Sequence, residues 1–511
     1  MERMTFSMCL KRAGIEKSFL REYDEEENYT REGEVHCTSS AFLCNESLDK
    51  VLFVYHNIYD SYTWPGGHND GERDFFKVAI RETEEETGIK NLTLYSAIPL
   101  HMGLLPVKEH VKNGKKVPAH KHLNITFAFV VDEREKVKVK EDENSDVRWL
   151  PMDKLASFSS EPHMIPIFEE CVRKLKEIQR EKERVFRTIP FNLLPWYDKN
   201  KRDLPWRREK SAYRTWVSEI MLQQTRVEAG KAYYERFLRE LPTVEDLAAC
   251  PEEKLMKLWE GLGYYNRAKN LQKTAKIIVN EYGGVFPNDC ETLKTLPGIG
   301  EYTAGAISSI AFEQKEPAVD GNVVRVLSRI TENYDVDLKK KLFSSLKAIY
   351  PDRAGDFTQS LMELGAIVCL PNGVPLCEKC PMKEDCLGRR LEVENFLPSL
   401  PPKRERRVET LFVYHIETPE GLVLRKRTKG VLKGMWELPN FEEEKELPFE
   451  GKRELGRKEF THVFTHVEWK MTCIYVKAEK TTMETHSWQE IEEALSIPSA
   501  FKKMIRKGEK M

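Results

Sequence analysis

The runs of residues that favour β-strands lie near the two ends of this 511-residue chain. Residues 36–60 and 123–131 contain β-rich runs such as VLFVY, and residues after 409 contain TLFVYHI and MTCIYVKA. Residues 187–390 instead show helical patterns that end at Gly or Pro, with hardly any strand pattern. At about 150 residues per domain, the length suggests three domains. The sequence therefore predicts an α/β domain, an all-α domain and a second α/β domain.

Two segments mark the predicted boundaries between these domains. Residues 166–186 form an apolar and then charged helix, typical of a connector, and residues 397–407 (LPSLPPKRERR) are Pro-rich and then basic, typical of an extended linker. The predicted organisation is: α/β domain 1–160, helical connector 161–186, helical domain 187–395, linker 396–408 and α/β domain 409–511.

Composition excludes some classes of protein. The chain has 40% hydrophobic and 32% charged residues, as globular proteins do, and it has no apolar run long enough to span a membrane. Its N-terminus lacks the apolar core of a signal peptide, so we expect an intracellular, cytoplasmic monomer whose cysteines are thiols or metal ligands. A net charge of −2 argues against a histone-like coating protein but permits DNA binding through a local basic face.

Four cysteines lie close together at the end of the helical region, with the spacing C-x7-C-x2-C-x5-C: Cys369, Cys377, Cys380 and Cys386. Four thiolates can hold an iron–sulfur cluster or a structural zinc ion. Zinc ribbons usually supply two C-x-x-C pairs, and only one is present, so the spacing favours iron–sulfur. Four unrelated buried thiols are the third alternative.

Three further features of the helical region are candidates for phosphate binding or for carboxylate chemistry. Gly298 and Gly300 in LPGIGEYTA permit a tight turn whose amides point at a phosphate, although an ordinary helix–helix turn has the same pattern. Asp320 precedes a likely helix start and can be a simple N-cap. Glu219, in the predicted helix 205–225, borders an apolar stripe, where a solvated carboxylate is the common alternative.

These segments resemble the helix-hairpin-helix DNA glycosylases, and SEIMLQQT, VDGNV and the W-x-G-L-G-Y-Y segment resemble the adenine glycosylases among them. The resemblance implies that Glu219 protonates adenine at N7, and that Asp320, in a motif with Asn322, stabilises the oxocarbenium-like sugar. It places Tyr302 where lyases carry a Schiff-base lysine, so the enzyme should be monofunctional. It also implies a structural 4Fe–4S cluster, although the first cysteine gap is seven residues rather than the common six.

An adenine inside a duplex must be flipped out before it can be cleaved. By the same resemblance, Gln224 and Tyr264 insert into the base stack beside the lesion. The residues alone leave open that Tyr264 is a core aromatic, a role that suits Tyr265 equally well.

The C-terminal segment resembles the Nudix-like domain with which adenine glycosylases read 8-oxoguanine. GMWELP and the F-T-H triplet carry this resemblance, which implies DNA contacts from Phe464, Thr465 and His466, with Thr in place of the usual Ser. A strand turn without DNA contact is the alternative. No R-E-x-x-E-E motif follows the WELP turn, so we expect no phosphohydrolase activity there.

The N-terminal segment GHNDGER…RETEEETGI resembles a Nudix box. A helix is predicted from about Asp74 to Thr87, where Gly88 ends it. Glu82, Glu85 and Glu86 share one face of this helix, where like charges oppose helix formation by about 0.2–0.5 kcal/mol per pair. Mg²⁺ or Mn²⁺ would neutralise them and activate a water that cleaves a diphosphate. Arg81 would orient the ligands. A solvated acidic helix is the alternative.

Two other residues bear on this box. Arg73 stands where the family has its first glutamate, with Glu72 one residue early, and Glu143 is a candidate for a further ligand.

The combined prediction is a repair enzyme that removes adenine opposite 8-oxoguanine or guanine from duplex DNA, fused to a Nudix hydrolase whose nucleotide substrate is open. An endonuclease III-like lyase is opposed by Tyr302 and by the C-terminal domain. A non-catalytic DNA-binding scaffold is opposed by the presence of both Glu219 and Asp320.

Overall fold

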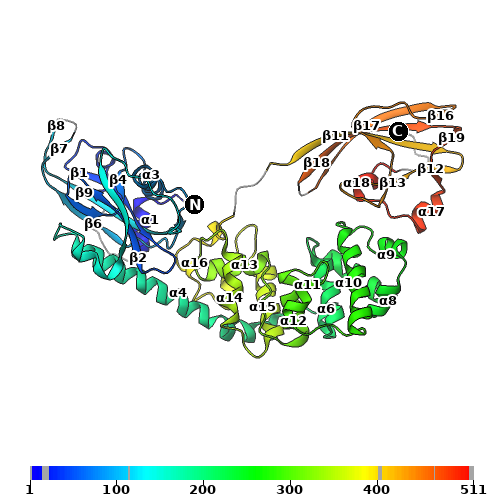
Figure 1. Ribbon diagram of the computed structural model, residues 1–511, viewed down its shortest axis with the longest axis horizontal. Coiled ribbons are helices and arrows are strands. Elements are labelled where there is room, and N and C mark those ends of the chain that lie inside the picture. Colours follow the sequence, from blue (N-terminus) through cyan, green and yellow to red (C-terminus); the bar gives the residue numbers. More distant parts are fainter. Residues whose placement is uncertain (1–2, 14–21, 113–114, 401–404, 465, 506–511) are drawn as a thin grey trace. The chain divides into compact units, whose positions relative to one another are not determined.

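The computed structural model describes residues 3–13, 22–112, 115–400, 405–464 and 466–505. It contains two compact units. Figure 1 shows strands near both ends of the chain and helices between them. The first comprises residues 1–201, 319–351 and 359–401, and the second comprises residues 202–318, 352–358 and 402–511. The helical region 187–395 therefore contributes to both units. The predicted order of α/β, all-α and α/β segments is confirmed.

An eight-stranded sheet forms the N-terminal domain, with strand order β10-β2-β1-β9-β5; β3, β4 and β6 pair with β2, β1 and β9. The pair β1/β9 is parallel and its other pairs are antiparallel. The strands are β1 (Val35–Cys44), β2 (Lys50–His56), β3 (Ser61–Thr63), β4 (Gly66–His68), β5 (Thr93–Leu94), β6 (His101–Val107), β9 (His120–Val130) and β10 (Asn144–Pro151); β7 (His110–Lys112) and β8 (Lys115–Val117) form a separate hairpin.

Helices cover both faces of this sheet, because alternate residues of β1 belong to different apolar clusters. Ala41 and Leu43 pack in a cluster with Phe75 of helix α3 (Phe75–Thr87), while Phe42 packs in a cluster with Phe168 of helix α4 (Ile165–Asn200). The domain also contains α1 (Phe6–Arg12) and the short 3₁₀ helices η1 (Glu26–Tyr29) and η2 (Met152–Ser157).

Local sequence explains the bounds of α3. Asp74 caps the helix by accepting the amides of Phe76 and Lys77 at 3.1 and 3.4 Å, and Gly88 ends it with a left-handed φ of 73°. The predicted helix over 74–87 is confirmed. Helix α4, in contrast, runs without a break across the predicted boundary at residue 186, because its apolar positions continue as Val185, Ile189 and Leu193.

The second unit begins with short helices around a core that includes Trp216, Phe237 and Trp259. They are α5 (Pro205–Arg208), α6 (Ala212–Leu222), α7 (Val227–Glu240), α8 (Val244–Ala249), α9 (Glu252–Leu258), α10 (Asn266–Tyr282), α11 (Cys290–Thr295) and α12 (Glu301–Phe312). The prediction of one helix over 205–225 was wrong, because Ser211 caps a new helix by accepting the amide of Arg214 at 3.1 Å.

Helices α13 (Gly321–Ile330) and α14 (Leu338–Lys347) belong to the first unit again. Helix α15 (Ala354–Ile367) contains residues of both units. The cysteine-bearing segment then holds η3 (Cys377–Lys379), α16 (Leu387–Arg390) and η4 (Glu394–Phe396). None of the described helices is both long and apolar enough to cross a membrane.

The C-terminal domain repeats the parallel central pair of the N-terminal sheet. Its six-stranded sheet has the order β17-β18-β11-β12-β20, and β15 pairs with β11. Strands β11 and β18 are parallel. The elements are β11 (Arg407–Thr418), β12 (Gly421–Val423), β13 (Arg425–Lys426), β14 (Trp436–Glu437), β15 (Asn440–Phe441), β16 (Phe449–Glu450), β17 (Arg453–Val463), β18 (Val467–Lys477), β19 (Lys480–Thr481), β20 (Thr485–His486), α17 (Trp488–Glu493) and α18 (Ser499–Lys502).

Candidate functional site

A carboxylate is buried between two helices of the second unit. Glu219 on α6 is 8% exposed, so the alternative of a solvated edge residue does not hold. The hydroxyl of Tyr302, in the first turn of α12, donates a hydrogen bond to Glu219 Oε2. The structure thus joins two residues that the sequence had singled out separately, a proposed general acid and the residue in the place of a lyase lysine.

A second carboxylate begins helix α13 in the first unit. Asp320 Oδ1 accepts the amide of Val323 at 2.8 Å, so the predicted N-cap role is confirmed. Its Oδ2 accepts the side-chain amide of Asn322 at 2.8 Å, and Asn322 Oδ1 accepts from Arg325 at 2.9 Å. Arg325 in turn donates to the carbonyl oxygen of Cys369 at 2.9 Å. This chain of bonds orients Asp320 and connects it to the first cysteine of the cluster segment.

Glu219 and Asp320 belong to different compact units. Their action on one sugar remains a prediction.

Gln224 and Tyr264 are exposed residues at loops of the second unit. Both are held in the left-handed backbone region, with φ values of 60° and 47°. The Tyr264 side chain is 52% exposed, whereas Tyr265 is 7% exposed and packs in the core. The structure therefore distinguishes the two tyrosines, and Tyr264 is the one available to enter a base stack.

Arg267 on α10 connects these two loops. Its Nη1 donates to the carbonyl oxygens of Ile220, Met221 and Gln223 at 2.7, 3.2 and 2.7 Å. Its Nη2 donates to the carbonyls of Leu262 and Gly263 at 3.1 and 3.2 Å. Burial lowers the Arg267 pKa to about 10, so the guanidinium still carries its charge at neutral pH. Sequence analysis missed this residue, since an Arg in a helix usually lies on the solvated face.

The predicted helical hairpin is present between α11 and α12. Gly298 has a φ of 79°, and a Cβ on it would lie 2.7 Å from Cβ of Asn270, so the turn requires glycine. Gly298 and Gly300 are exposed, while Ile299 between them is buried. The exposed turn precedes the N-terminus of α12, an arrangement suited to a phosphate.

The four cysteines of the cluster segment line one cavity in the first unit. All are free thiols, and burial raises the pKa values of Cys380 and Cys386 to about 12. Arg329 donates to Cys369 Sγ at 3.3 Å, so positive charge is available to offset thiolates. Among the described residues, one set of three or more His, Cys, Asp or Glu side chains has its ligand atoms within 4.8 Å of one another, and it consists of four histidines rather than these cysteines. The choice between an iron–sulfur cluster and zinc for these four thiols stays a prediction.

In the C-terminal domain, Phe464 and His466 lie between β17 and β18. Phe464 is half-buried against Trp469, with ring centroids 4.7 Å apart, and His466 is exposed. Thr465 lies outside the described residues. Glu437 of the WELP turn is 1% exposed and paired with Arg425 and Arg427 at 3.0 and 2.7 Å. A carboxylate so paired has a structural role, and DNA contact by the triplet stays a prediction.

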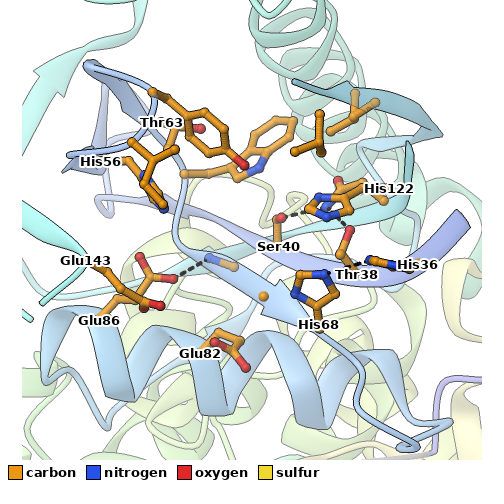
Figure 2. A pocket seen from close by; sticks show the side chains of 18 of the residues that line it. His36, Thr38, Ser40, His56, Thr63, His68, Glu82, Glu86, His122 and Glu143 are labelled. Atoms are coloured by element: carbon orange, nitrogen blue, oxygen red, sulfur yellow. Dashed lines mark hydrogen bonds between the residues drawn. The ribbon is translucent and has the colours of Figure 1, made fainter. Parts of the chain in front are cut away.

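The predicted metal ligands of the N-terminal domain line a cavity of about 490 Å³ (Figure 2). Glu86 Oε1 accepts the amide of Gly66 at 2.9 Å, and burial raises its pKa to about 7. Burial also raises the pKa of Glu82. Arg81 donates to Glu82 at 2.7 Å and to the carbonyl of His68 at 2.8 Å, which agrees with an orienting role. A Cβ on Gly67 would lie 2.4 Å from the Glu82 carboxyl, so a larger residue there would displace this carboxyl.

This donor set fits a hard divalent cation. Glu85 and Glu143 also line the cavity, and Lys140 Nζ lies 3.7 and 2.7 Å from their carboxyl oxygens. Mg²⁺ keeps several waters and takes few carboxylates, so the ligands need not close on it from all sides. Two buried carboxyls that resist ionisation are stabilised in their charged form by such a cation.

Neither residue at the irregular position of the box lines this cavity. Arg73 stacks over the Tyr29 ring at 4.7 Å, and Glu72 pairs with Lys77 at 2.5 Å. Glu72 therefore does not replace the missing glutamate.

Three parts of the chain match models of known protein families. The model of the HhH-GPD superfamily of base excision DNA repair proteins matches residues 217–351, and models of the NUDIX domain match residues 34–171 and 412–507. The adenine DNA glycosylase of Rattus norvegicus is 34% identical over 405 residues, which are 62% of this chain and 77% of that protein.

Two further relatives are also adenine DNA glycosylases, and a smaller share of their length aligns with this chain. The Arabidopsis thaliana protein is 36% identical over 350 residues, covering 59% of this chain and 55% of that protein. The Homo sapiens protein is 47% identical over 224 residues, covering 41% of each chain. The chain thus spans about half the length of these two relatives. From its 34% identity over 77% of the rat protein, the chain belongs to the adenine DNA glycosylase family, with a NUDIX domain at each end.

Proposed function

We propose that the chain hydrolyses the N-glycosidic bond of adenine paired with 8-oxoguanine or guanine in duplex DNA and leaves the strand uncut. The observation that carries this proposal is the buried Glu219 with its bond from Tyr302. A carboxyl in such a site can hold the proton that adenine needs to leave. Tyr302 has no amine, so a Schiff base cannot form at that position.

The other residues have supporting roles in this proposal. Asp320, held by Val323 and Asn322, stabilises the positive charge that develops on the sugar. Tyr264 and Gln224 enter the base stack while the adenine is out of it. Cys369, Cys377, Cys380 and Cys386 hold a 4Fe–4S cluster of structural role. The Phe464–His466 turn reads the base opposite the adenine.

An excision assay on three duplexes tests the proposal, with adenine opposite 8-oxoguanine, adenine opposite guanine, and thymine glycol opposite adenine. We expect breaks only after alkali and only in the first two duplexes, and no breaks with Glu219→Gln. Direct nicking would show that the enzyme is a lyase. No activity from protein with intact cluster absorbance would favour the non-catalytic scaffold.

We also propose that the N-terminal domain is a Mg²⁺- or Mn²⁺-dependent hydrolase of a nucleoside-diphosphate-linked substrate. The observation in its favour is the cavity that Glu82, Glu85 and Glu86 line. By analogy with the partner activity, oxidised deoxynucleoside triphosphates are the first substrates to test. Glu85→Gln should abolish Mg²⁺-dependent hydrolysis while adenine excision continues. Glu84→Gln is the matched control, because Glu84 pairs with Lys90 at 2.9 Å and does not line the cavity. Equal activity of both variants would refute the assignment of the metal ligands.

A further inference from the structure

Four histidines meet at the end of the N-terminal cavity away from Glu86. They are His36, His68, His120 and His122, and one ring nitrogen from each lies within 4.8 Å of the others. Figure 2 shows three of them, with His36 and His122 on the side opposite Glu86 and Glu143. No local motif marks them, because they come from three different strands and only His120 and His122 are close in the chain.

Strand register brings these side chains to one face of the sheet. His36 of β1 pairs with His122 of β9, and Thr38 of β1 pairs with His68 of β4. Residues two apart in a strand share a face, so His36 lies on the same face as Thr38, and His120 on the same face as His122. The three strands are neighbours in the sheet, and the cluster is therefore a direct product of the fold.

Backbone carbonyls orient two of the rings as they do in metal sites. His36 Nε2 lies 2.9 Å from the carbonyl of Gly33, which can only accept, so this nitrogen carries the proton and Nδ1 is left bare. His120 Nδ1 lies 3.0 Å from the carbonyl of Pro118, and by the same argument its Nε2 is bare. A metal-bound histidine almost always donates its other N–H to a carbonyl or carboxylate in this way.

The bare nitrogens point at the remaining two histidines. His36 Nδ1 lies 3.2 Å from His68 Nε2, and His120 Nε2 lies 3.1 Å from His122 Nε2. Four nitrogens around a tetrahedral Zn²⁺ at about 2.1 Å would be about 3.4 Å apart, which is close to the distances within these two pairs. The nitrogens of different pairs, which lie within 4.8 Å of one another, would have to move closer when the ion binds.

We propose that His36, His68, His120 and His122 bind one divalent transition-metal ion of the Zn²⁺ type, at a site separate from the carboxylates that bind Mg²⁺ or Mn²⁺. An all-imidazole donor set suits Zn²⁺, Cu²⁺ or Ni²⁺, whereas carboxylates suit the hard cations. The filled site adds a second cation to the cavity wall and so faces an anionic substrate. This consequence rests on the proposed hydrolase function, while metal binding itself does not.

Zn²⁺ binding by the untagged full chain with its cysteine cluster intact tests the proposal. Equilibrium dialysis against Zn²⁺ in excess Mg²⁺ should give one tightly bound zinc per chain. X-ray absorption at the zinc edge should show a shell of imidazole nitrogens without sulfur. His68→Ala and His120→Ala should each lose this zinc. His163→Ala should retain it, because His163 lines the same cavity outside the cluster.

Zinc binding by the unsubstituted protein tests the proposal even where a variant fails to fold. Absence of stoichiometric zinc, or a shell containing sulfur, would overturn the proposal. So would zinc that persists in both His68→Ala and His120→Ala. Because none of these measurements uses nucleotide hydrolysis, failure of the hydrolase proposal is a separate result.

Discussion

Arg267 should control the shape of the surface that enters the DNA. It donates five hydrogen bonds to carbonyls at the C-terminal end of α6, at Gln223 and in the loop that precedes Tyr264. Gln224 and Tyr264, which follow these carbonyls, have left-handed conformations. Such conformations cost about 1–3 kcal/mol each and persist only where the surrounding structure enforces them. Replacing Arg267 with Met keeps the length and the helix propensity but removes every donor.

The bonds give the size of the effect. Each bond contributes about 1 kcal/mol net, and the five bonds are shared between two nitrogens. The free energy that opposes local opening of the two loops should therefore fall by about 3–5 kcal/mol. A loss of 3 kcal/mol corresponds to an equilibrium constant for local opening that is about 100-fold larger. Arg236→Met is the matched control, because within the described part of the chain Arg236 donates to a single carbonyl, that of Leu258 at 2.9 Å. In Arg236→Met the free energy that opposes local opening should fall by only about 1 kcal/mol.

Hydrogen exchange followed by mass spectrometry can measure this opening in the segments 219–226 and 260–267. We expect much faster exchange there in Arg267→Met than in Arg236→Met. Single-turnover excision of adenine should fall at least tenfold in Arg267→Met. Unchanged exchange in both segments would refute the reasoning, since the carbonyls would then have other donors. Faster exchange with an unchanged excision rate would refute the link from these loops to base extrusion.

Three further outcomes follow from individual contacts. Tyr302→Phe removes the hydroxyl that bonds Glu219 and should slow single-turnover excision several-fold while DNA affinity, measured by fluorescence anisotropy, stays the same. Gly67→Ala places a Cβ 2.4 Å from the Glu82 carboxyl, so Mg²⁺-dependent hydrolysis should be lost and excision retained in parallel assays. Without divalent metal, folded Glu86 holds its proton up to about pH 7, above its ordinary pKa of 4.5, so the native state binds more protons between these values. Hydrogen exchange in α3 should then show stability falling as pH rises from about 4.5 to about 7, and Mg²⁺ or Glu86→Gln should weaken this dependence.

Contiguous motifs could be assigned from the sequence. The helix over 74–87, the turn at Gly298 and the N-cap at Asp320 depend on neighbouring residues, so local chemistry determines them. The order of α/β, all-α and α/β segments follows from hydrophobic periodicity in the same way. The break at Ser211 was missed, because an N-cap inside a helical pattern competes with continuation of the helix, and neighbouring packing decides between them.

Relations between distant residues needed the tertiary structure. Only the packing of α6 on α12 brings Tyr302 to Glu219, and only burial separates the exposed Tyr264 from the core Tyr265. Arg267 has an ordinary place in a helical sequence, and its carbonyl partners lie up to 47 positions away in the chain. The same holds for the four histidines, which strand register alone brings together. The sequence by itself determined which chemistry is present, and the fold decided which of those groups share a site, because contact between distant residues depends on packing and pairing rather than on spacing along the chain.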